Sequence, residues 1–411
     1  MIGAVWQAGQ FGATASAWDT RISQLQSGGA TYVPISPLRV LDSRTPLGVG
    51  GSFAANAPRT FQVGGFSSPS GSIPATAIAV TGNLTVTGQT GAGYVSLTTI
   101  ATTSPRSSTL NFPAGDTRAN NVTVPLSAAG KLAAVYKAAA GRSAQLVFDV
   151  TGYFVPGASG SGYSVLAPTR FLDSRAGKGI GLTGRFVHGV PRKLDVAGVK
   201  GVPPDAVAVT ANLTVVNQTR AGFVSVTPTA VASPATSTIN FPTGDTRANG
   251  LTVKLGGGDL YLVYRGSGGQ TDLVLDITGY YRPAGAGLAF YPLDPGRLMD
   301  TRTTVLTGLT GTFSSGTPRR LDTDGHWGVP AGAKAITGNL TVTAQTGAGY
   351  VSGTPTAVAN PTTSTLNFPT GDTRANGITV PLNSNGNQYF VYKASSGRKT
   401  HLILDLTGYF K

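Results

Sequence analysis

The sequence contains no cysteine and no glutamate, so its 17 acidic residues are all aspartate. Without cysteine the chain cannot form disulfides, cysteine-ligated zinc sites or a thiol nucleophile. Charged residues make up only 12% of the chain. No apolar run reaches the roughly 20 residues that span a bilayer. The lack of glutamate, together with abundant valine and threonine, disfavours helices and favours strands.

The few charges present are unbalanced, with 31 lysines and arginines and a formal net charge of +14. These charges are spread along the chain and favour acidic partners, such as cell-wall polymers or an acidic protein shell. No recognition helix or basic arm is evident, so nucleic acid is not an expected partner. The N-terminal stretch "MIGAVWQAGQFGATASAW" has no basic region and its apolar run is broken, so we do not predict a signal peptide.

An internal repeat organises most of the sequence. The string "TGNLTVTGQTGAGYVSL", which begins at Thr81, returns in similar form at Thr210 and Thr337. Its flanking landmarks also recur in a constant order, which indicates tandem copies of one unit. We predict three domains joined by short Gly- and Pro-rich linkers. They are repeat 1 (32–156), repeat 2 (163–283) and repeat 3 (288–411).

Each repeat is predicted to be β structure. Segments such as 77–87, 120–126 and 144–154 are rich in β-branched and aromatic residues. The Gly-rich "QTGAGY" that follows the first of these segments predicts a hairpin turn. A unit of this length can bury its own core. We therefore expect an all-β chain of three tandem β-sandwich, jelly-roll-like domains, arranged as beads on a string.

Residues 1–31 differ from the repeats and carry apolar residues at heptad spacing. A helix packed on repeat 1 is one interpretation, since two heptads are too few for a free-standing coiled coil. We favour an anchor or oligomerisation helix, with a trimer as the preferred state and another virion protein as a partner. Its residues would be Trp6, Phe11, Ala15, Trp18, Ile22 and Leu25.

Two Asp-(Ser/Thr)-Arg triplets occur in every repeat. Because one catalytic centre does not need three copies, we interpret them as structural corners. Arginine presents a planar fork that can bind a carboxylate with two hydrogen bonds. We predict that the Arg of one triplet binds the Asp or backbone of the other triplet in the same repeat. The pairs are Asp42 and Arg44, Asp116 and Arg118, Asp173 and Arg175, Asp245 and Arg247, Asp300 and Arg302, and Asp372 and Arg374.

The second triplet lies in "NFPAGDTRANN" (111–121), which returns as "NFPTGDTRANG". Gly115 and Asp116 are typical of a tight turn. Asn120, Gly250 and Gly377 are residues that can adopt the left-handed conformation. One carboxylate beside an arginine does not suit calcium.

A carbohydrate site next to these loops is an alternative role for the repeated strings. Its candidate surface-binding aromatics are Tyr94, Phe223 and Tyr350, which otherwise would pack within the sheets. The tripeptide Asn-Leu-Thr at 83–85, 212–214 and 339–341 matches a glycosylation pattern. It lies within a predicted strand each time, so we interpret it as strand.

Nothing in the sequence indicates catalysis. The three histidines, His188, His326 and His401, occupy different places in the repeats and show no paired metal spacing. No G-x-S-x-G nucleophile motif is present. The richest unique cluster of acids, "RRLDTDGHWGVP" (319–330), corresponds to a turn in repeat 2. We expect no enzyme activity, no catalytic residues, no metal and no cofactor.

The ordered motifs "LDSR", "NLTVT", "GYVS", "STLNFPAGDTRANNVTVPL" and "LVFDVTGYF" resemble the tandem β-repeats of large secreted cell-surface proteins of actinobacteria. The resemblance covers nearly all of 32–411 and implies surface display. Such proteins begin with a signal peptide, and this N-terminus departs from that pattern. A short N-terminal segment followed by β-domains also resembles the virion fibre proteins of phages that infect actinobacteria.

Together these features predict a non-enzymatic bacteriophage virion protein at the virion surface, either a tail fibre or minor tail protein or a capsid decoration or head fibre. Its β-domains would attach to host cell-wall polysaccharide or another acidic polymer, with no membrane span. The alternative is a secreted bacterial cell-surface adhesin with carbohydrate-binding repeats.

Overall fold

The computed structural model describes residues 29–283, 286–303 and 308–411, and all regular structure within these ranges is β-strand. The prediction of an all-β fold is confirmed. No helix that could cross a membrane occurs in these ranges. The expected anchor residues Trp6, Phe11, Ala15, Trp18, Ile22 and Leu25 lie outside the described residues. Strand β1 begins at Ala30, so the end of the segment assigned to the anchor belongs to the sheet.

Each repeat forms two facing sheets, and repeat 2 shows the pattern. One sheet has the order β12-β20-β15-β18 with β13 beside β20, and the other has the order β14-β19-β16-β17. The strands are β12 (Gly162–Asp173), β13 (Phe186–Val187), β14 (Arg192–Asp195), β15 (Ala208–Val216), β16 (Gly222–Thr227), β17 (Ile239–Phe241), β18 (Arg247–Lys254), β19 (Asp259–Gly266) and β20 (Gln270–Arg282).

Repeats 1 and 3 follow the same order of strands, and their first sheets join into one sheet where Ala30 of β1 pairs with Phe290 of β21. Repeat 1 contains β1 (Ala30–Asp42), β2 (Phe53–Ala54), β3 (Arg59–Gln62), β4 (Ser67–Ser68), β5 (Gly71–Ser72), β6 (Ala79–Thr87), β7 (Gly93–Thr98), β8 (Leu110–Phe112), β9 (Arg118–Pro125), β10 (Lys131–Lys137) and β11 (Ser143–Pro156). Repeat 3 contains β21 (Phe290–Asp300), β22 (Phe313–Ser314), β23 (Arg319–Asp322), β24 (Ala335–Thr343), β25 (Gly349–Thr354), β26 (Leu366–Phe368), β27 (Arg374–Pro381), β28 (Asn387–Lys393) and β29 (Lys399–Phe410).

The string "QTGAGY" does not form the expected hairpin. It leads from β6, which pairs with β9 and β11, to β7, which pairs with β8 and β10. These strands belong to opposite sheets of the sandwich. The Gly-rich turn therefore carries the chain across the core, because the apolar faces of both strands must meet there.

Strand β6 shows how the sequence pattern positions a repeat. Its apolar side chains, including Val80 and Leu84, enter the core of the sandwich. The alternating polar side chains of Thr81, Asn83 and Thr85 lie on the other face of the sheet, as strand geometry requires. Yet these three residues are at most 6% exposed. Another surface must cover the polar face of the sheet.

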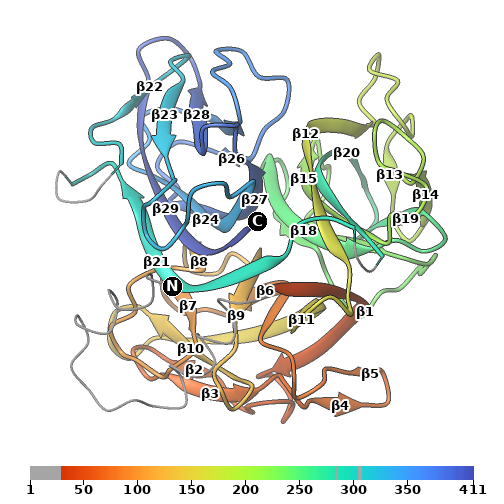
Figure 1. Ribbon diagram of the computed structural model, residues 1–411, viewed down its shortest axis with the longest axis vertical. Helices are drawn as coiled ribbons and strands as arrows, with labels where there is room; N and C mark the ends of the chain where they lie inside the picture. The colour runs from red at the N-terminus through yellow and green to blue at the C-terminus, as the bar shows by residue number, and fades with distance from the viewer. Residues whose placement is uncertain (1–28, 284–285, 304–307) are drawn as a thin grey trace, which may run out of the picture.

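That surface is provided by the other repeats. Figure 1 shows three lobes around a common axis, with β9, β18 and β27 nearest the centre. The polar-faced sheet of every lobe is turned inward. The expectation of independent beads is therefore wrong, because each repeat uses one face of a sheet to bind its neighbours.

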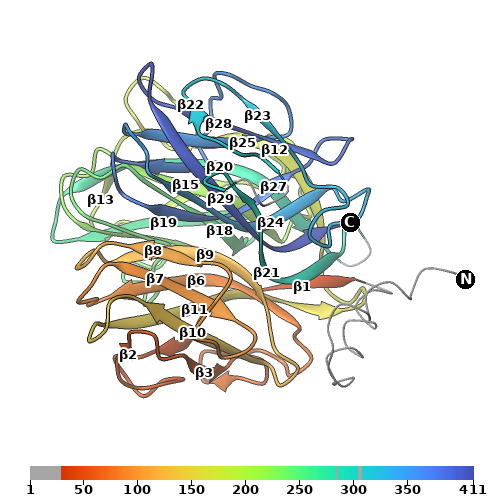
Figure 2. The same cartoon turned by 90° about the vertical axis from the view of Figure 1, so that its left-hand side faces the viewer.

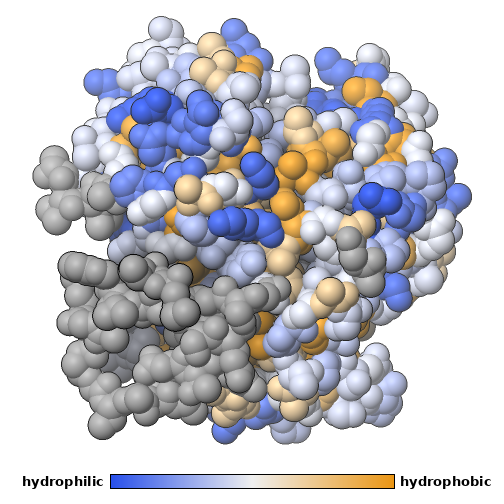
Figure 3. All heavy atoms as spheres, in the orientation of Figure 1, coloured by the Kyte–Doolittle hydropathy of each residue, from blue (hydrophilic) through white to orange (hydrophobic). Residues whose placement is uncertain are grey.

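Both ends of the described chain lie at the same end of this axis. The backbone oxygen of Gly29 accepts a hydrogen bond from the backbone N–H of Gly157. Lys411 and Ala289 form two backbone hydrogen bonds with each other. Figure 2 shows the C-terminus and the start of β1 on one side of the molecule. Seen from that side in Figure 3, apolar residues gather where the lobes meet. The opposite end of the axis is formed by the "GDTRAN" turns.

Candidate functional site

Three arginines and three aspartates form a closed ring around the axis, which we call the Asp/Arg ring. Its members are Asp116, Arg118, Asp245, Arg247, Asp372 and Arg374. Each arginine binds the aspartate of its own triplet and that of a neighbouring repeat. Arg247 Nη2, for example, lies 2.7 Å from both Asp245 Oδ2 and Asp116 Oδ2. The ring therefore ties all three repeats together.

The arginines of this ring are almost wholly buried, with side chains only 2–3% exposed. Each also donates to main-chain carbonyl groups. Arg247 Nη1 donates to the oxygen of Asn240 in its own repeat and to that of Thr117 in repeat 1. Burying a charge is costly unless its hydrogen bonds are satisfied. The ring meets this condition by giving every guanidinium several acceptors.

The predicted pairing between the two triplets of one repeat is wrong. In the first triplets, the arginines bind the aspartates of the same triplet, as in Arg44 to Asp42 at 2.7 Å. Arg175 and Arg302 repeat this contact with Asp173 and Asp300. In repeat 1 the first triplet lies at the end of β1 and the second at the start of β9, at the same edge of the sheet, but β11 and β6 lie between these two strands. This distance prevents direct pairing.

The turn that carries each ring aspartate is held by a glutamine. Gln89 Nε2 donates to the oxygens of Pro113 and Asp116, and Gln218 and Gln345 do the same in repeats 2 and 3. Gly115 has φ +74°, as the tight-turn prediction required. These glutamines were not predicted from the sequence, although their threefold recurrence in "QT" was a usable signal.

A layer of asparagines lies next to the ring. Asn249 Nδ2 donates to Asn83 Oδ1 of repeat 1, and Asn249 Oδ1 accepts from the backbone N of Asn121. Equivalent bonds join Asn376 to Asn212 and Asn120 to Asn339. The Asn-Leu-Thr tripeptides lie within strands, as predicted. Their asparagines are buried and bind a neighbouring repeat.

Asn120, Gly250 and Gly377 do not adopt the left-handed conformation that is open to them, since all three lie in strands and none has a positive φ. Gly250 and Gly377 allow the main chains of neighbouring repeats to approach each other closely. A Cβ at Gly250 would lie 2.0 Å from the oxygen of Gly377, and one at Gly377 would lie 1.9 Å from the oxygen of Asn121. Only glycine permits this separation.

Six aromatic side chains close the axis at the end where the termini lie. They form a continuous aromatic ring in the order Tyr32, Phe154, Phe290, Phe410, Tyr163 and Tyr281. The contacts between repeats are the shortest, with centroids 4.2–4.3 Å apart. All six side chains are at most 2% exposed. The aromatic ring thus joins the repeats at one end of the axis, and the Asp/Arg ring joins them at the other.

A second set of arginines lies at the sides of the axis. Arg39 binds Asp149 with two hydrogen bonds and donates to the oxygen of Ala235 in repeat 2. Burial raises the pKa of Asp149, although Arg39 opposes this shift. Arg170 makes the same contacts with Asp276 and with the oxygen of Thr362 in repeat 3.

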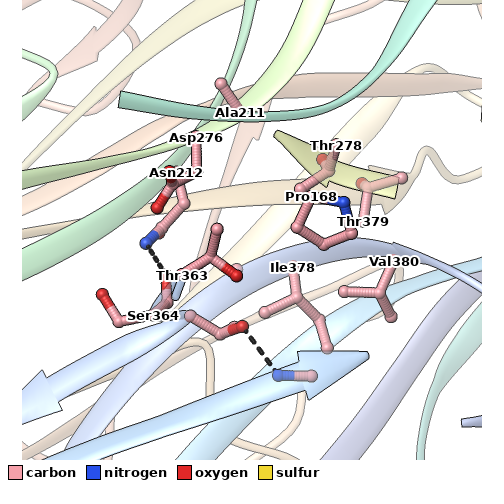
Figure 4. A pocket seen from close by; sticks show the side chains of 13 residues that line it. Pro168, Ala211, Asn212, Asp276, Thr278, Thr363, Ser364, Ile378, Thr379 and Val380 are labelled. Carbon is pink, nitrogen blue, oxygen red and sulfur yellow. Dashed lines mark hydrogen bonds between the residues drawn. The ribbon is translucent and has the colours of Figure 1, made fainter. Parts of the chain in front are cut away.

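Small polar cavities lie beside these arginines. Figure 4 shows the cavity of about 20 Å³ between repeats 2 and 3, where Asn212 donates to the oxygen of Ser364. Its walls include Asp276 and Thr278 from one repeat and Thr363 from the other. A space of this size and polarity suits one water molecule, so these cavities are part of the joint between repeats.

The candidate surface aromatics Tyr94, Phe223 and Tyr350 are half-buried, and Tyr94 and Tyr350 lie near arginines of a neighbouring repeat. Burial raises the pKa of Tyr94, and the nearby charge of Arg297 in repeat 3 opposes this shift. Tyr94 also lines a cavity of about 380 Å³ between repeats 1 and 3. This larger cavity is a candidate binding site, and the sequence alone did not connect its two walls.

We expect replacement of Asp116 by asparagine to lower the free energy of unfolding by about 2–3 kcal/mol near neutral pH, because Arg118 and Arg247 each lose one of their two carboxylate partners. Burial alone would raise the pKa of Asp116, but Arg247 and Arg118 outweigh it and lower the pKa. A lowered folded-state pKa stabilises the fold above the unfolded value, near pH 4, and this gain is lost at lower pH.

Urea unfolding at several pH values should therefore show a difference between wild type and Asp116→Asn that shrinks below about pH 4. Groups such as Asp149, whose pKa is raised, affect both proteins alike and cancel in this difference. Asp195→Asn, at a side chain 72% exposed, is the control and should leave stability nearly unchanged. A difference independent of pH would contradict the role of the charged form.

Within the described ranges, no group of three or more potential metal-ligating side chains could hold a metal ion. The ring aspartates do not form such a group, because each carboxylate is bound by two guanidinium groups. The arrangement can therefore hold three lobes together and expose the grooves between them. When the chain is compared with protein-family models and with curated proteins, it matches none of them.

Proposed function

We propose that the chain is a non-enzymatic structural protein of a bacteriophage virion, a tail fibre or minor tail protein or a capsid decoration or head fibre, that attaches to the host surface. Each repeat would be a jelly-roll-like domain of one rigid head. The order of strands in the two sheets supports this assignment. The resemblance of the repeat motifs to those of actinobacterial surface proteins supports an actinobacterial host.

The proposal rests mainly on the difference between the two ends of the head, which is the three-lobed body formed by the repeats. The chain enters the head at Gly29 and ends at Lys411, both at the end closed by the aromatic ring. The opposite end carries the Asp/Arg ring, and the cavity beside Tyr94 reaches Thr373, next to Arg374 of that ring. A head held by residues 1–28 would thus present its grooves away from the particle.

Immunogold electron microscopy of purified phage particles, with antibodies raised against the head, tests this proposal. We expect labelling on tails or capsids, and deletion of residues 1–28 should reduce incorporation at least about tenfold. Deleting the turn that contains the exposed Ile100 is the control and should leave incorporation unchanged. Labelling of the bacterial envelope in cells without phage particles would instead support the secreted adhesin.

A further inference from the structure

The three contacts between repeats differ in the bonds made by the arginines at the sides of the axis. Arg39 donates to the oxygen of Ala235 at 2.6 Å, and Arg170 donates to the oxygen of Thr362 at 2.7 Å. By repeat position, Arg297 should donate to the oxygen of Arg106. Among the described residues Arg297 binds only Asp300 and Asp405. The contact between repeats 3 and 1 is therefore open where the other two are closed.

A cavity of about 380 Å³ lies at this open contact. Tyr94 and Arg106 of repeat 1 form one wall, and Arg297 and Arg302 of repeat 3 form the other. A neighbouring cavity of about 200 Å³ shares Arg106 and reaches Asp294. Ligand sites commonly have volumes of about 300–1,000 Å³, so we call these joined cavities the 3/1 groove.

The 3/1 groove is rich in free hydrogen-bond donors. Arg106 is exposed and makes no hydrogen bond or ion pair with any described residue. The hydroxyl of Tyr94 also has no partner there, whereas its counterpart in repeat 3, Tyr350, donates to the oxygen of Pro361. The third counterpart, Phe223, has no hydroxyl. These donors occur together only where the contact is open.

Two of the negative groups near these arginines lie behind them. Asp300 and Asp405 are paired with Arg297 and Arg302, and their side chains are only 1–4% exposed. In the larger cavity, guanidinium groups therefore form the charged surface that a ligand would meet, whereas Asp294 lines the neighbouring cavity beside Arg106. Guanidinium forks bind carboxylates in a two-bond geometry. Asp294, in the neighbouring cavity, has a carboxylate that can accept hydrogen bonds from hydroxyl groups.

We propose that the 3/1 groove binds an acidic saccharide, with its carboxylate on Arg106 and Arg297 and a sugar ring against Tyr94. This inference rests on the proposed attachment function and names the class of ligand. The other two contacts, where Arg39 and Arg170 already bind a neighbouring carbonyl group, do not take this ligand. One site per chain is therefore expected.

Calorimetric titration of the full chain with trigalacturonate tests the inference, with the carboxyl-reduced trisaccharide as the matched ligand. We expect one site for the acidic form and at least about tenfold weaker binding of the reduced form. Arg106→Ala should weaken binding about tenfold. Repeat 2 carries alanine at this position, Ala235, so the fold should tolerate the change. Tyr94→Phe should weaken binding about fivefold, and Tyr350→Phe should not alter it.

Three results would overturn the 3/1 groove as an acidic-saccharide site. They are absence of binding, equal binding of both trisaccharides, and unchanged binding by Arg106→Ala. Weakening by Tyr350→Phe equal to that by Tyr94→Phe would also overturn it. Electron microscopy of particles separates this result from the proposed function. Virions that carry a head without saccharide binding overturn only the groove, and a binding head that is missing from virions overturns only the virion assignment.

Discussion

Replacing Arg247 with alanine is expected to lower the free energy of unfolding by about 3–5 kcal/mol, measured by urea denaturation, because the change breaks buried ion pairs. The side chain is only 3% exposed and binds Asp245 and Asp116 at 2.7 Å. Both carboxylates would keep one arginine, Arg374 or Arg118. The loss should therefore weaken the contact between repeats 1 and 2 while leaving the ring partly paired.

Arg44→Ala is the matched control, because it alters the same kind of triplet at a side chain that is 50% exposed. Exposed ion pairs contribute at most about 1 kcal/mol. A double-mutant cycle between Arg247 and Asp116 should give a coupling of about 1–3 kcal/mol, since residues of one network are not additive. An unchanged unfolding midpoint in Arg247→Ala would contradict the Asp/Arg ring as a stabilising element.

Phe290→Ala should lower the free energy of unfolding by about 3–5 kcal/mol, because truncation of a buried phenylalanine leaves a cavity. The ring of Phe290 lies 4.2 Å from that of Phe154 in repeat 1 and 5.1 Å from that of Phe410. The change therefore removes one contact between repeats and one within repeat 3. Thermal unfolding followed by near-ultraviolet circular dichroism measures the loss.

Tyr291→Ala, at the next position of β21, is the control for this variant. Tyr291 stacks on Tyr409 with centroids 5.0 Å apart, is half-buried and has no ring contact with another repeat. Its loss should cost less stability than that of Phe290. Equal losses of stability in the two variants would show that the aromatic ring at the axis contributes no more to stability than the stacked tyrosine pair does.

Local structure was largely predictable from the sequence. The turn at Gly115 and the strand around Asn83 follow from short-range rules, since a left-handed glycine and β-branched neighbours leave few alternatives. The repeated landmarks of the sequence also lie on strands that follow one order in each repeat. These features depend on residues that are close in the chain, where the backbone itself limits the choices.

The contacts between repeats were not predictable in the same way. Alternation along β6 predicts a core face and a solvent face, and Thr81, Asn83 and Thr85 have the polarity of exposed residues. They are buried because the neighbouring repeats supply hydrogen-bond partners, and polarity alone does not reveal those partners. Similarly, Arg118 could have paired with any of several aspartates. Its choice of Asp372 depends on an arrangement of segments 254 residues apart.

The 3/1 groove was not predictable for the same reason, because its two walls come from segments far apart in the chain. Tyr94 and Arg297 occupy ordinary repeated positions, and their counterparts Phe223 and Arg39 have similar chemistry. What distinguishes the groove is a missing hydrogen bond, which only the folded chain can show. The side chain of Arg106 differs from those of Ala235 and Thr362 at the same position, but without the fold there was no reason to compare these residues across a contact.

The direction of the contacts in the Asp/Arg ring limits how many copies such a molecule can hold. Arg247 reaches back to repeat 1, Arg374 to repeat 2, and Arg118 forward to repeat 3, so every copy gives one guanidinium and receives another. Head-to-tail contacts of this kind close into a ring when the rotation fits. A fourth copy would find no open partner, and two copies would leave a buried arginine unpaired. By the same geometry, three separate single-repeat chains could build this head with the same contacts.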